Sequence, residues 1–203
     1  MLDTHARKYV SPIFDKLSDL MIKLKLSANT VTMIAFIIGV SSAVAMYFEK
    51  GIPSFILLWT SGLFDAVDGE VARKTNTKSM LGAQMDIVSD RIVEILFIWA
   101  VALRNQNVLY ELLLLMSMIL ISITIFLTTG MISKNNTKKS FYYQSGIMER
   151  TEGFIMFSFM IIFKEYLNVV ILIYALLIFI TIIQRIVETI KINKEVHNEE
   201  NNK

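Results

Sequence analysis

The sequence predicts an all-α membrane protein with six transmembrane helices, preceded by an amphipathic helix that lies in the membrane interface. The first observation is that 54% of its 203 residues are hydrophobic and occur in blocks, which is typical of a polytopic membrane protein. The second is that only two prolines and eight glycines occur, which favours long, uninterrupted helices. The third is that no segment shows the alternating pattern of a transmembrane barrel.

Residues 1–28 predict a helix with two unlike faces. Apolar residues such as Val10, Phe14 and Leu17 recur at helical spacing, and Lys and Asp residues fill the opposite face. In front of a membrane domain, a helix with a basic polar face is expected to lie flat among the lipid headgroups. The same periodicity is also compatible with a soluble helix packed on a partner. We expect no cleavable signal peptide, because this segment carries charges throughout.

Residues 29–192 predict the transmembrane domain. Six apolar blocks follow the amphipathic segment, near residues 31–48, 52–66, 83–103, 108–131, 153–163 and 167–187. A helix needs about 20 residues to cross a bilayer. The second block is therefore expected to stay helical to Arg73, and the short fifth block to recruit polar residues at its start. The polar stretch 193–203 predicts a disordered tail.

The distribution of Lys and Arg predicts how the helices are oriented. One side of the membrane would hold the N-terminal helix, the connections after the second and fourth spans, and the C-terminal tail, all of them rich in Lys and Arg. The other side would hold only Lys50, Arg104 and Lys164. Because basic residues mark the cytoplasmic face, both termini are predicted to lie in the cytoplasm, with the protein in the cell membrane.

Four aspartates flank the connection between the second and third predicted spans. Asp65 and Asp68 are three residues apart, and Asp86 and Asp90 are four apart, so each pair shares one helix face, with angular separations of about 60° and 40°. Two antiparallel helices would bring both pairs together at the cytoplasmic side. Because four carboxylates at one place repel one another, we expect two divalent cations there. All-oxygen ligation indicates Mg²⁺ or Mn²⁺, and Ca²⁺ is also compatible with it.

The composition and the neighbouring residues narrow the chemistry. The chain has no cysteine, and His5 and His197 lie near its ends, so thiolate and histidine-cluster metal sites are excluded. Carboxylates that hold two divalent ions are a known arrangement for phosphoryl chemistry. Gly69 directly follows Asp68 and lets a ligand approach the helix backbone, and Arg73, one turn later, can pair with phosphate oxygens.

Two other classes of protein are alternatives: a cation transporter or channel with an acidic site, and a membrane-shaping protein that works through its N-terminal helix. Neither needs Gly69, Arg73 and Gly82 at these spacings. A transporter more often places its charges near the bilayer midplane, at broken helices. We therefore favour an enzyme that acts on a headgroup at the membrane interface.

Residues 65–90 read D-x-x-D-G-x-x-A-R-x8-G-x3-D-x3-D. This pattern resembles the signature of the CDP-alcohol phosphotransferase family, and every fixed residue matches. Residues 27–32, "SANTVT", are similar to the Pro-Asn-x-x-Thr-like start of the first span in that family, with Ala28 in place of the usual proline. The resemblance implies an interfacial helix followed by six spans, and a homodimer.

The resemblance also implies roles for individual residues. Asp65, Asp68 and Asp86 would bind the metal ions, and Asp90 would lie near the second ion and act as the general base. The residues that contact the CDP-linked lipid would be Asn29, Thr32, Gly69, Arg73 and Ser79. The hydroxyl of an alcohol would attack the lipid-side phosphorus, CMP would leave, and a phosphodiester lipid would form. The expected partners are thus a CDP-linked lipid and a small alcohol, and no nucleic acid.

The four aspartates do not indicate which alcohol accepts the transferred group. Residues 146–152 are similar to the Gly-x-x-x-Arg-x-Glu stretch of the inositol-phosphate branch of the family, although Gly153 follows where many relatives place a basic residue. That resemblance implies a pocket for the phosphate of the acceptor, formed by Lys138, Lys139, Arg150 and Arg185. The same residues are also compatible with ordinary cytoplasmic charges. Glycerol 3-phosphate or another polyol is the alternative acceptor, and the lipid is either ester- or ether-linked.

Overall fold

The computed structural model describes residues 2–136 and 146–201, with side chains described for residues 11–131 and 146–193. Its helices are α1 (Leu2–Lys23), α2 (Ala28–Tyr47), α3 (Gly51–Lys74), α4 (Met80–Arg104), α5 (Leu109–Asn136), α6 (Arg150–Ile162) and α7 (Leu167–Asn201). Single 3-10 turns, η1 (Gln106–Val108) and η2 (Lys164–Tyr166), precede α5 and α7. The predicted all-α class is confirmed, because these described residues contain no strand.

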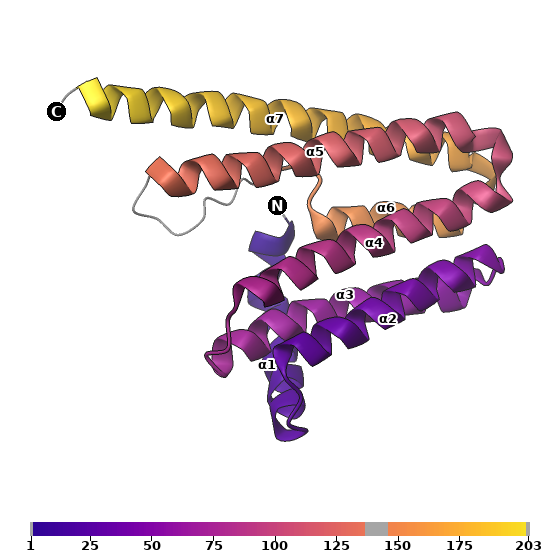
Figure 1. Cartoon of the computed structure of the whole chain (residues 1–203). Helices are drawn as coiled ribbons and strands as arrows, with labels where there is room; N and C mark the ends of the chain where they lie inside the picture. The colour runs from indigo at the N-terminus through magenta and orange to yellow at the C-terminus, as the bar shows by residue number, and fades with distance from the viewer. Residues whose placement is uncertain (1, 137–145, 202–203) are drawn as a thin grey trace.

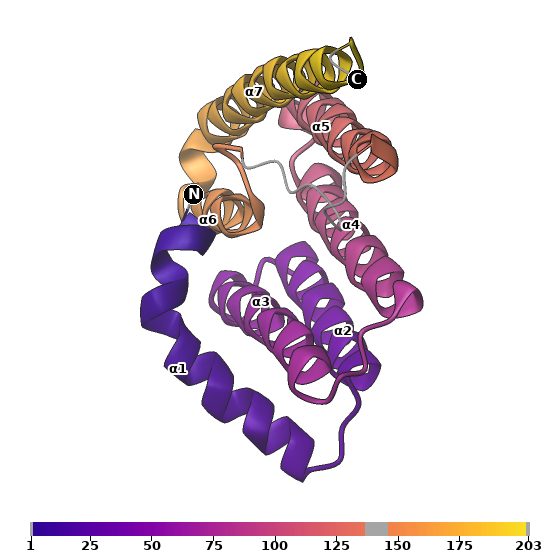
Figure 2. The same ribbon diagram turned by 90° about the vertical axis from the view of Figure 1, so that its left-hand side faces the viewer.

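Helices α2 to α7 form a ring, which Figure 2 shows nearly end-on. The order around the ring is α2, α4, α5, α7, α6 and α3, and each helix contacts both of its neighbours in this order. The α3–α4 connection and the C-terminus lie at the end of the ring on the left of Figure 1, and the α2–α3 and α4–α5 connections lie at the opposite end. Successive helices therefore run in opposite directions.

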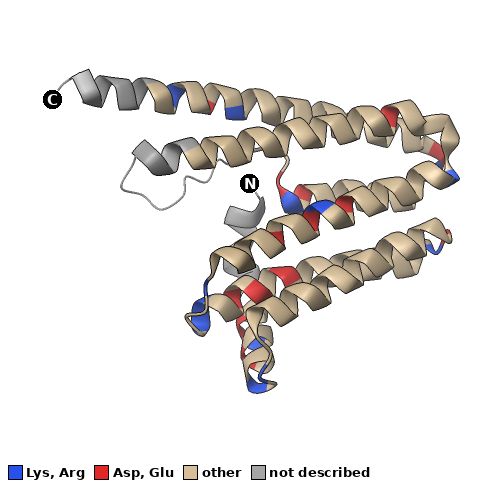
Figure 3. Ribbon diagram, viewed as in Figure 1, with Lys and Arg blue, Asp and Glu red and all other residues tan. Residues whose placement is uncertain are grey.

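Apolar side chains fill the half of the ring that lies away from the α3–α4 connection. Leu58, Phe97, Phe157 and Ile171 come from four different helices and are fully buried there. The ring of Phe157 lies 4.8 Å from that of Phe97 and 5.6 Å from that of Tyr174, measured between centroids. Figure 3 shows that the acidic residues of α3, α4 and α6 lie towards the other half. The interior of the ring is thus divided into an apolar half and a charged half.

Three stretches of the described chain are long and apolar enough to cross a membrane, namely Ala28–Tyr47, Gln106–Met131 and Lys164–Asn193. Helices α3 and α4 have 24 and 25 residues, about 36 Å at 1.5 Å per residue, but they carry the acidic residues. Helix α6 has 13 residues, about 20 Å, which is shorter than the roughly 30 Å hydrocarbon core. The ring contains the six helices in the predicted order, and their number of membrane crossings stays a prediction.

One helix boundary agrees with the sequence prediction and another differs from it. Helix α6 begins at Arg150, three residues before the predicted block 153–163, so the fifth helix does recruit polar residues at its start. Helix α7 continues to Asn201, within the stretch 193–203 that was predicted to be a disordered tail. The sequence contains no proline or glycine after Gly153, and therefore no residue that would break the helix there.

Helix α1 lies outside the ring and runs crosswise to the other helices, next to α3 (Figures 1 and 2). Met21 packs with Val67 and other apolar residues of α2 and α3 in a second, smaller core. Lys74, at the end of α3, has its Nζ atom 2.8 Å from Asp19 Oδ1 and 3.3 Å from Asp15 Oδ1. The hydrogen bond to Asp19 raises the pKa of Lys74. The predicted N-terminal helix is thus fixed to α3 by apolar and ionic contacts.

Gly39 is expected to be essential for the close packing of α2 against α3 and α4. A Cβ atom at this position would lie 2.7 Å from Val93 Cγ2 and 2.8 Å from Ser61 Oγ. Gly39→Ala should therefore overpack this contact and lower the melting temperature of the purified protein in detergent by about 3–10 °C. The control is Gly69→Ala, whose Cβ would meet only the Arg73 side chain. Equal melting temperatures for the two variants would contradict the packing account.

Candidate active site

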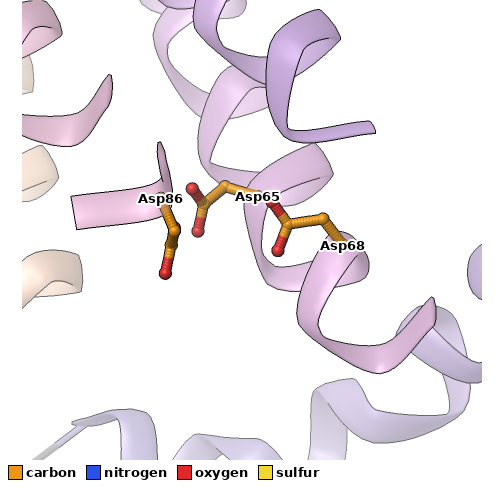
Figure 4. Close-up of side chains that lie close together, drawn as sticks. All are labelled: Asp65, Asp68 and Asp86. Atoms are coloured by element: carbon orange, nitrogen blue, oxygen red, sulfur yellow. The ribbon is translucent and has the colours of Figure 1, made fainter. Parts of the chain in front are cut away.

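Three aspartates from α3 and α4 converge inside the ring. Asp65, Asp68 and Asp86 each offer a carboxylate oxygen, and these oxygens lie within 4.8 Å of one another. We call these three residues the acidic cluster. Figure 4 shows Asp65 and Asp68 projecting from one helix towards Asp86. Asp65 and Asp68 are only 8% and 7% exposed. The structure therefore brings together three of the four residues that were predicted to bind metal.

Helix α2 holds the two acidic helices in place. It packs against both α3 and α4, and on its α3 side Ser61 Oγ donates a hydrogen bond of 2.8 Å to the carbonyl oxygen of Ala35. Thr32 on α2 donates to Asp68, and its hydroxyl also lies 3.1 Å from the carbonyl oxygen of Ala28. Residues three or four apart share a helix face, so the spacing of the aspartates directs both pairs inward once α2 fixes the helices.

Arg150, the first residue of α6, reaches into the same region. Its Nη1 atom pairs with Asp65 and lies 3.9 Å from Asp86 Oδ1, and its Nη2 atom donates to Asp90. The guanidinium thus joins α6 to both acidic helices and offsets part of the repulsion between the carboxylates. Arg150 was predicted to bind the phosphate of the acceptor, and the sequence alone gave no sign of these ion pairs.

One oxygen of the acidic cluster lacks a hydrogen bond from the protein. Asp86 Oδ1 is buried and accepts no hydrogen bond within the part of the chain that the structure describes. Moreover, the single positive charge of Arg150 cannot balance the negative charges of four carboxylates, those of Asp65, Asp68, Asp86 and Asp90. Three clustered carboxylates, one of which has an oxygen without a hydrogen-bond donor, fit a hard divalent cation.

A cavity of about 100 Å³ lies beside the acidic cluster, and we call it the basic cavity. Arg91 from α4, Arg150 from α6 and Arg185 from α7 line it. Arg185 is buried, and its Nη1 atom donates to the carbonyl oxygen and the hydroxyl of Ser122 on α5 at 2.9 and 2.8 Å. Its guanidinium also lies 5.1 Å from the ring centroid of Phe126. Glu94 and Glu149 also line the cavity, so its three arginines outnumber its two carboxylates, and this excess of positive charge suits an anion.

The residues predicted to contact the CDP-linked lipid lie near the ends of α2, α3 and α4. Ser79 Oγ accepts a hydrogen bond of 3.0 Å from Gly82 N and caps the start of α4. A Cβ atom at Gly82 would lie 3.0 Å from Asn29 Oδ1, so Asn29, Ser79 and Gly82 are close neighbours. Arg73 pairs with Glu70, at 3.1 Å between Nε and Oε2, and side chains of both remain partly exposed.

Gly69 leaves one face of α3 bare, as predicted from its place after Asp68. A Cβ atom there would meet only the Arg73 side chain, 3.5 Å from its Nη1 atom. Thr32, the other residue predicted to contact the lipid nucleotide, has its hydroxyl engaged with Asp68. The contacts of these residues with a CDP-linked lipid stay predictions.

Some of the predicted site residues do not belong to the acidic cluster. Asp90 is paired with Arg150 and does not belong to the acidic cluster. Lys138 and Lys139 lie outside the described residues. Conversely, the sequence analysis missed Arg91 and Glu94, which line the basic cavity. A signal for Glu94 was present, because it follows Asp90 by four residues and therefore shares its helix face.

The sequence model of the CDP-alcohol phosphatidyltransferase family matches residues 25–184. The chain belongs to this family. The match begins just after α1 and extends into α7, so it includes the helices of the ring and all four aspartates. The resemblance noted from residues 65–90 is thereby confirmed over residues 25–184.

Parts of the chain are similar in sequence to curated enzymes from other organisms. A phosphatidylinositol phosphate synthase of Corynebacterium glutamicum is 35% identical over 100 residues, which are 46% of this chain and 43% of that protein. A bifunctional IPC transferase and DIPP synthase of Aquifex aeolicus is 37% identical over 80 residues, 39% of this chain and 18% of that protein. The matched region thus spans less than half the length of each of these relatives.

Solved structures share the fold over nearly the whole chain. The phosphatidylinositol phosphate synthase of Mycobacterium tuberculosis with CDP-DAG bound gives a TM-score of 0.72 at 20% identity and covers 88% of this chain and 94% of that chain. The same enzyme in complex with manganese and citrate gives a TM-score of 0.71 at 19% identity, over 87% of this chain and 88% of that chain. At these identities the likeness shows the arrangement of the helices.

Asp68→Asn should weaken divalent-cation binding, because it removes one of the three charges of the acidic cluster while keeping the size of the side chain. We expect the affinity for Mn²⁺, measured by calorimetric titration of the purified protein, to fall at least about tenfold. The matched control is Asp19→Asn, which changes an exposed carboxylate paired with Lys74. If both variants bound Mn²⁺ as tightly as the unaltered protein, the acidic cluster would not be the cation site.

Proposed function

We propose that the protein transfers a phosphatidyl-type group from a CDP-linked lipid to a hydroxyl of a small phosphorylated alcohol and releases CMP. The observation that carries this proposal is that the acidic cluster and the basic cavity adjoin inside one ring and both contact Arg150. The acidic cluster suits a diphosphate held together with divalent cations, and the basic cavity suits a second phosphate, that of the acceptor. Membership of the CDP-alcohol phosphatidyltransferase family supports the reaction class.

Asp65, Asp68 and Asp86 would hold the cations, and Asp90 would lie beside the second of two ions. The buried oxygen set and the orphaned Asp86 Oδ1 atom fit this role. Mg²⁺ and Mn²⁺ are the proposed ions, and the manganese complex of the Mycobacterium tuberculosis enzyme supports the second. When bound, divalent cations supply positive charge that reduces the repulsion between the carboxylates and the diphosphate.

Asp90 is the proposed general base. It lines a small cavity together with Asp65 and Arg150, and its side chain is 19% exposed. Its carboxylate takes the proton of the attacking hydroxyl. The hydroxyl oxygen forms a bond to the lipid-side phosphorus, and the bond from that phosphorus to the oxygen of CMP breaks, so that CMP leaves with the electron pair. For this step Arg150 must release Asp90 and turn towards the acceptor.

The CDP part of the donor is proposed to lie along the open ends of α2, α3 and α4. Gly69 supplies a face without a side chain, and Arg73 supplies a charge for the phosphates. Asn29, Thr32 and Ser79 provide polar groups near the nucleotide. The CDP-DAG complex of the Mycobacterium tuberculosis enzyme, which has the same fold, supports a CDP-linked lipid as the donor.

Inositol phosphate is the proposed acceptor. Its phosphate would lie between Arg150 and Arg185 in the basic cavity, with Lys138 and Lys139 adding positive charge. The names of the relatives from Corynebacterium glutamicum and Mycobacterium tuberculosis support this choice. Glycerol 3-phosphate or another phosphorylated polyol is the alternative, since an arginine pocket recognises the phosphate and not the carbon skeleton.

The protein is proposed to lie in the cell membrane with all six ring helices across the bilayer and both termini in the cytoplasm, as a homodimer. Three stretches of the chain satisfy the length and apolarity of a span. The excess of Lys and Arg on the side of the α3–α4 connection supports the orientation. In this arrangement α1 runs along the membrane surface.

The proposed function is tested by measuring CMP release from CDP-diacylglycerol by the purified protein with Mg²⁺ or Mn²⁺. The acceptor panel contains inositol 1-phosphate, glycerol 3-phosphate, serine and free inositol. We expect release that depends on an acceptor carrying both a phosphate and a hydroxyl, with inositol 1-phosphate giving the highest kcat/KM. Absence of CMP release with every acceptor and both metals would refute the proposed reaction.

Asp90→Asn should nearly abolish turnover, because an amide cannot take the proton of the hydroxyl. We expect kcat to fall by about 10² to 10⁴ while Mn²⁺ binding at the acidic cluster is largely kept. The two quantities are compared by the CMP-release assay and by calorimetric titration. A variant that kept a near-normal kcat would show that Asp90 is not the general base.

A further inference from the structure

Glu94 lies on α4 one turn beyond Asp90 and faces the interior of the ring. It lines the small cavity, which also contacts Asp65 and Asp90, and it lines the basic cavity, which also contacts Arg185. Among the residues whose side chains the structure describes, only Glu94 and Arg150 line both cavities. If the phosphate of an acceptor lies in the basic cavity and its reacting hydroxyl lies at Asp90, the middle of the molecule would lie next to Glu94 and Arg150.

The Glu94 carboxylate is held firmly. Its Oε2 atom is buried and lies 2.5 Å from Arg91 Nη1, and the Glu94 side chain is 13% exposed. The ion pair with Arg91 offsets part of the cost of burying this carboxylate. A carboxylate accepts hydrogen bonds through about four lone pairs on two oxygens, so the pairing with Arg91 leaves it capacity for further donors.

A carboxylate at this position favours some parts of an acceptor molecule over others as neighbours. It repels the phosphate of the acceptor, which is thereby directed towards the arginines, and it accepts hydrogen bonds from hydroxyl groups. A buried group that is built to hydrogen-bond a substrate hydroxyl disfavours analogues that lack this hydroxyl, because the group is then left unpaired.

From this geometry we infer that Glu94 determines the specificity for the acceptor by accepting hydrogen bonds from its non-reacting hydroxyls. The acceptor class is thus a phosphorylated polyol that carries further hydroxyls between its phosphate and the attacking oxygen. This inference rests on the proposed function. The competing role for Glu94 is to position Arg91 alone, and such an effect would not depend on the hydroxyls of the acceptor.

The experiment changes the enzyme and the acceptor together. CMP release is measured for the unaltered protein and Glu94→Gln with inositol 1-phosphate and with its monodeoxy analogues, each lacking one non-reacting hydroxyl. The matched control is Glu165→Gln, which makes the same substitution at an exposed residue of η2, at the end of the ring opposite the α3–α4 connection.

In the unaltered protein and in the control, at least one deoxy analogue should lower kcat/KM by about tenfold or more, as expected for a hydrogen bond to a charged group. Glu94→Gln should lower kcat/KM for inositol 1-phosphate by a similar factor, mainly through KM. In Glu94→Gln the same analogue should differ from its parent by less than about threefold, because the two changes remove the same contact.

The inference would be overturned if the unaltered protein and Glu94→Gln discriminated equally between the deoxy analogues and the parent. It would also be overturned if the unaltered protein used every deoxy analogue as well as the parent.

If Glu94→Gln is not monodisperse on size exclusion, Glu94→Asp takes its place, and it should show a weaker preference for the parent than the unaltered protein does. An unaltered protein that turns over only serine would overturn this inference and leave the transfer reaction standing. One that releases no CMP with any acceptor would refute the reaction itself.

Discussion

The structure depends on keeping carboxylates close together inside a ring of apolar helices. Asp65 and Asp68 are buried, and Asp86 contributes an oxygen within 4.8 Å of theirs. Such a group is unfavourable unless positive charge accompanies it. Arg150 supplies one positive charge from α6, and bound divalent cations would supply the rest. The position of α6 in the ring is thus fixed partly by the same electrostatic demand that defines the site.

The division of the ring into two halves gives this site its shape. Apolar residues such as Phe97 and Phe157 close one half by tight packing, and the charged half leaves the cavities. Close contacts of α2 with α3 and α4 at Gly39 hold the acidic helices at a fixed spacing. A site on packed helices keeps its residues in position better than one on loops, and α1 lies outside, where it does not obstruct the interior.

The sequence was sufficient for features that depend on spacing within one helix. The intervals between Asp65, Asp68, Asp86 and Asp90 predicted shared faces, and Gly69 predicted a bare surface. It was insufficient for contacts between distant helices, because Arg150 meets Asp65 and Asp90 only once α6 has docked in the ring. The same reason hid the basic cavity, whose residues come from four helices. The spacing of four residues places Glu94 on the same helix face as Asp90, but its position between two cavities is visible only in the folded structure.

Anomalous diffraction from crystals of the protein grown with Mn²⁺ would show directly whether the acidic cluster holds a divalent cation. We expect an anomalous peak between the carboxylates of Asp65, Asp68 and Asp86, with Arg150 displaced from at least one of its aspartate partners. If Mn²⁺ bound only elsewhere and Arg150 stayed paired with both Asp65 and Asp90, the acidic cluster would not be the cation site.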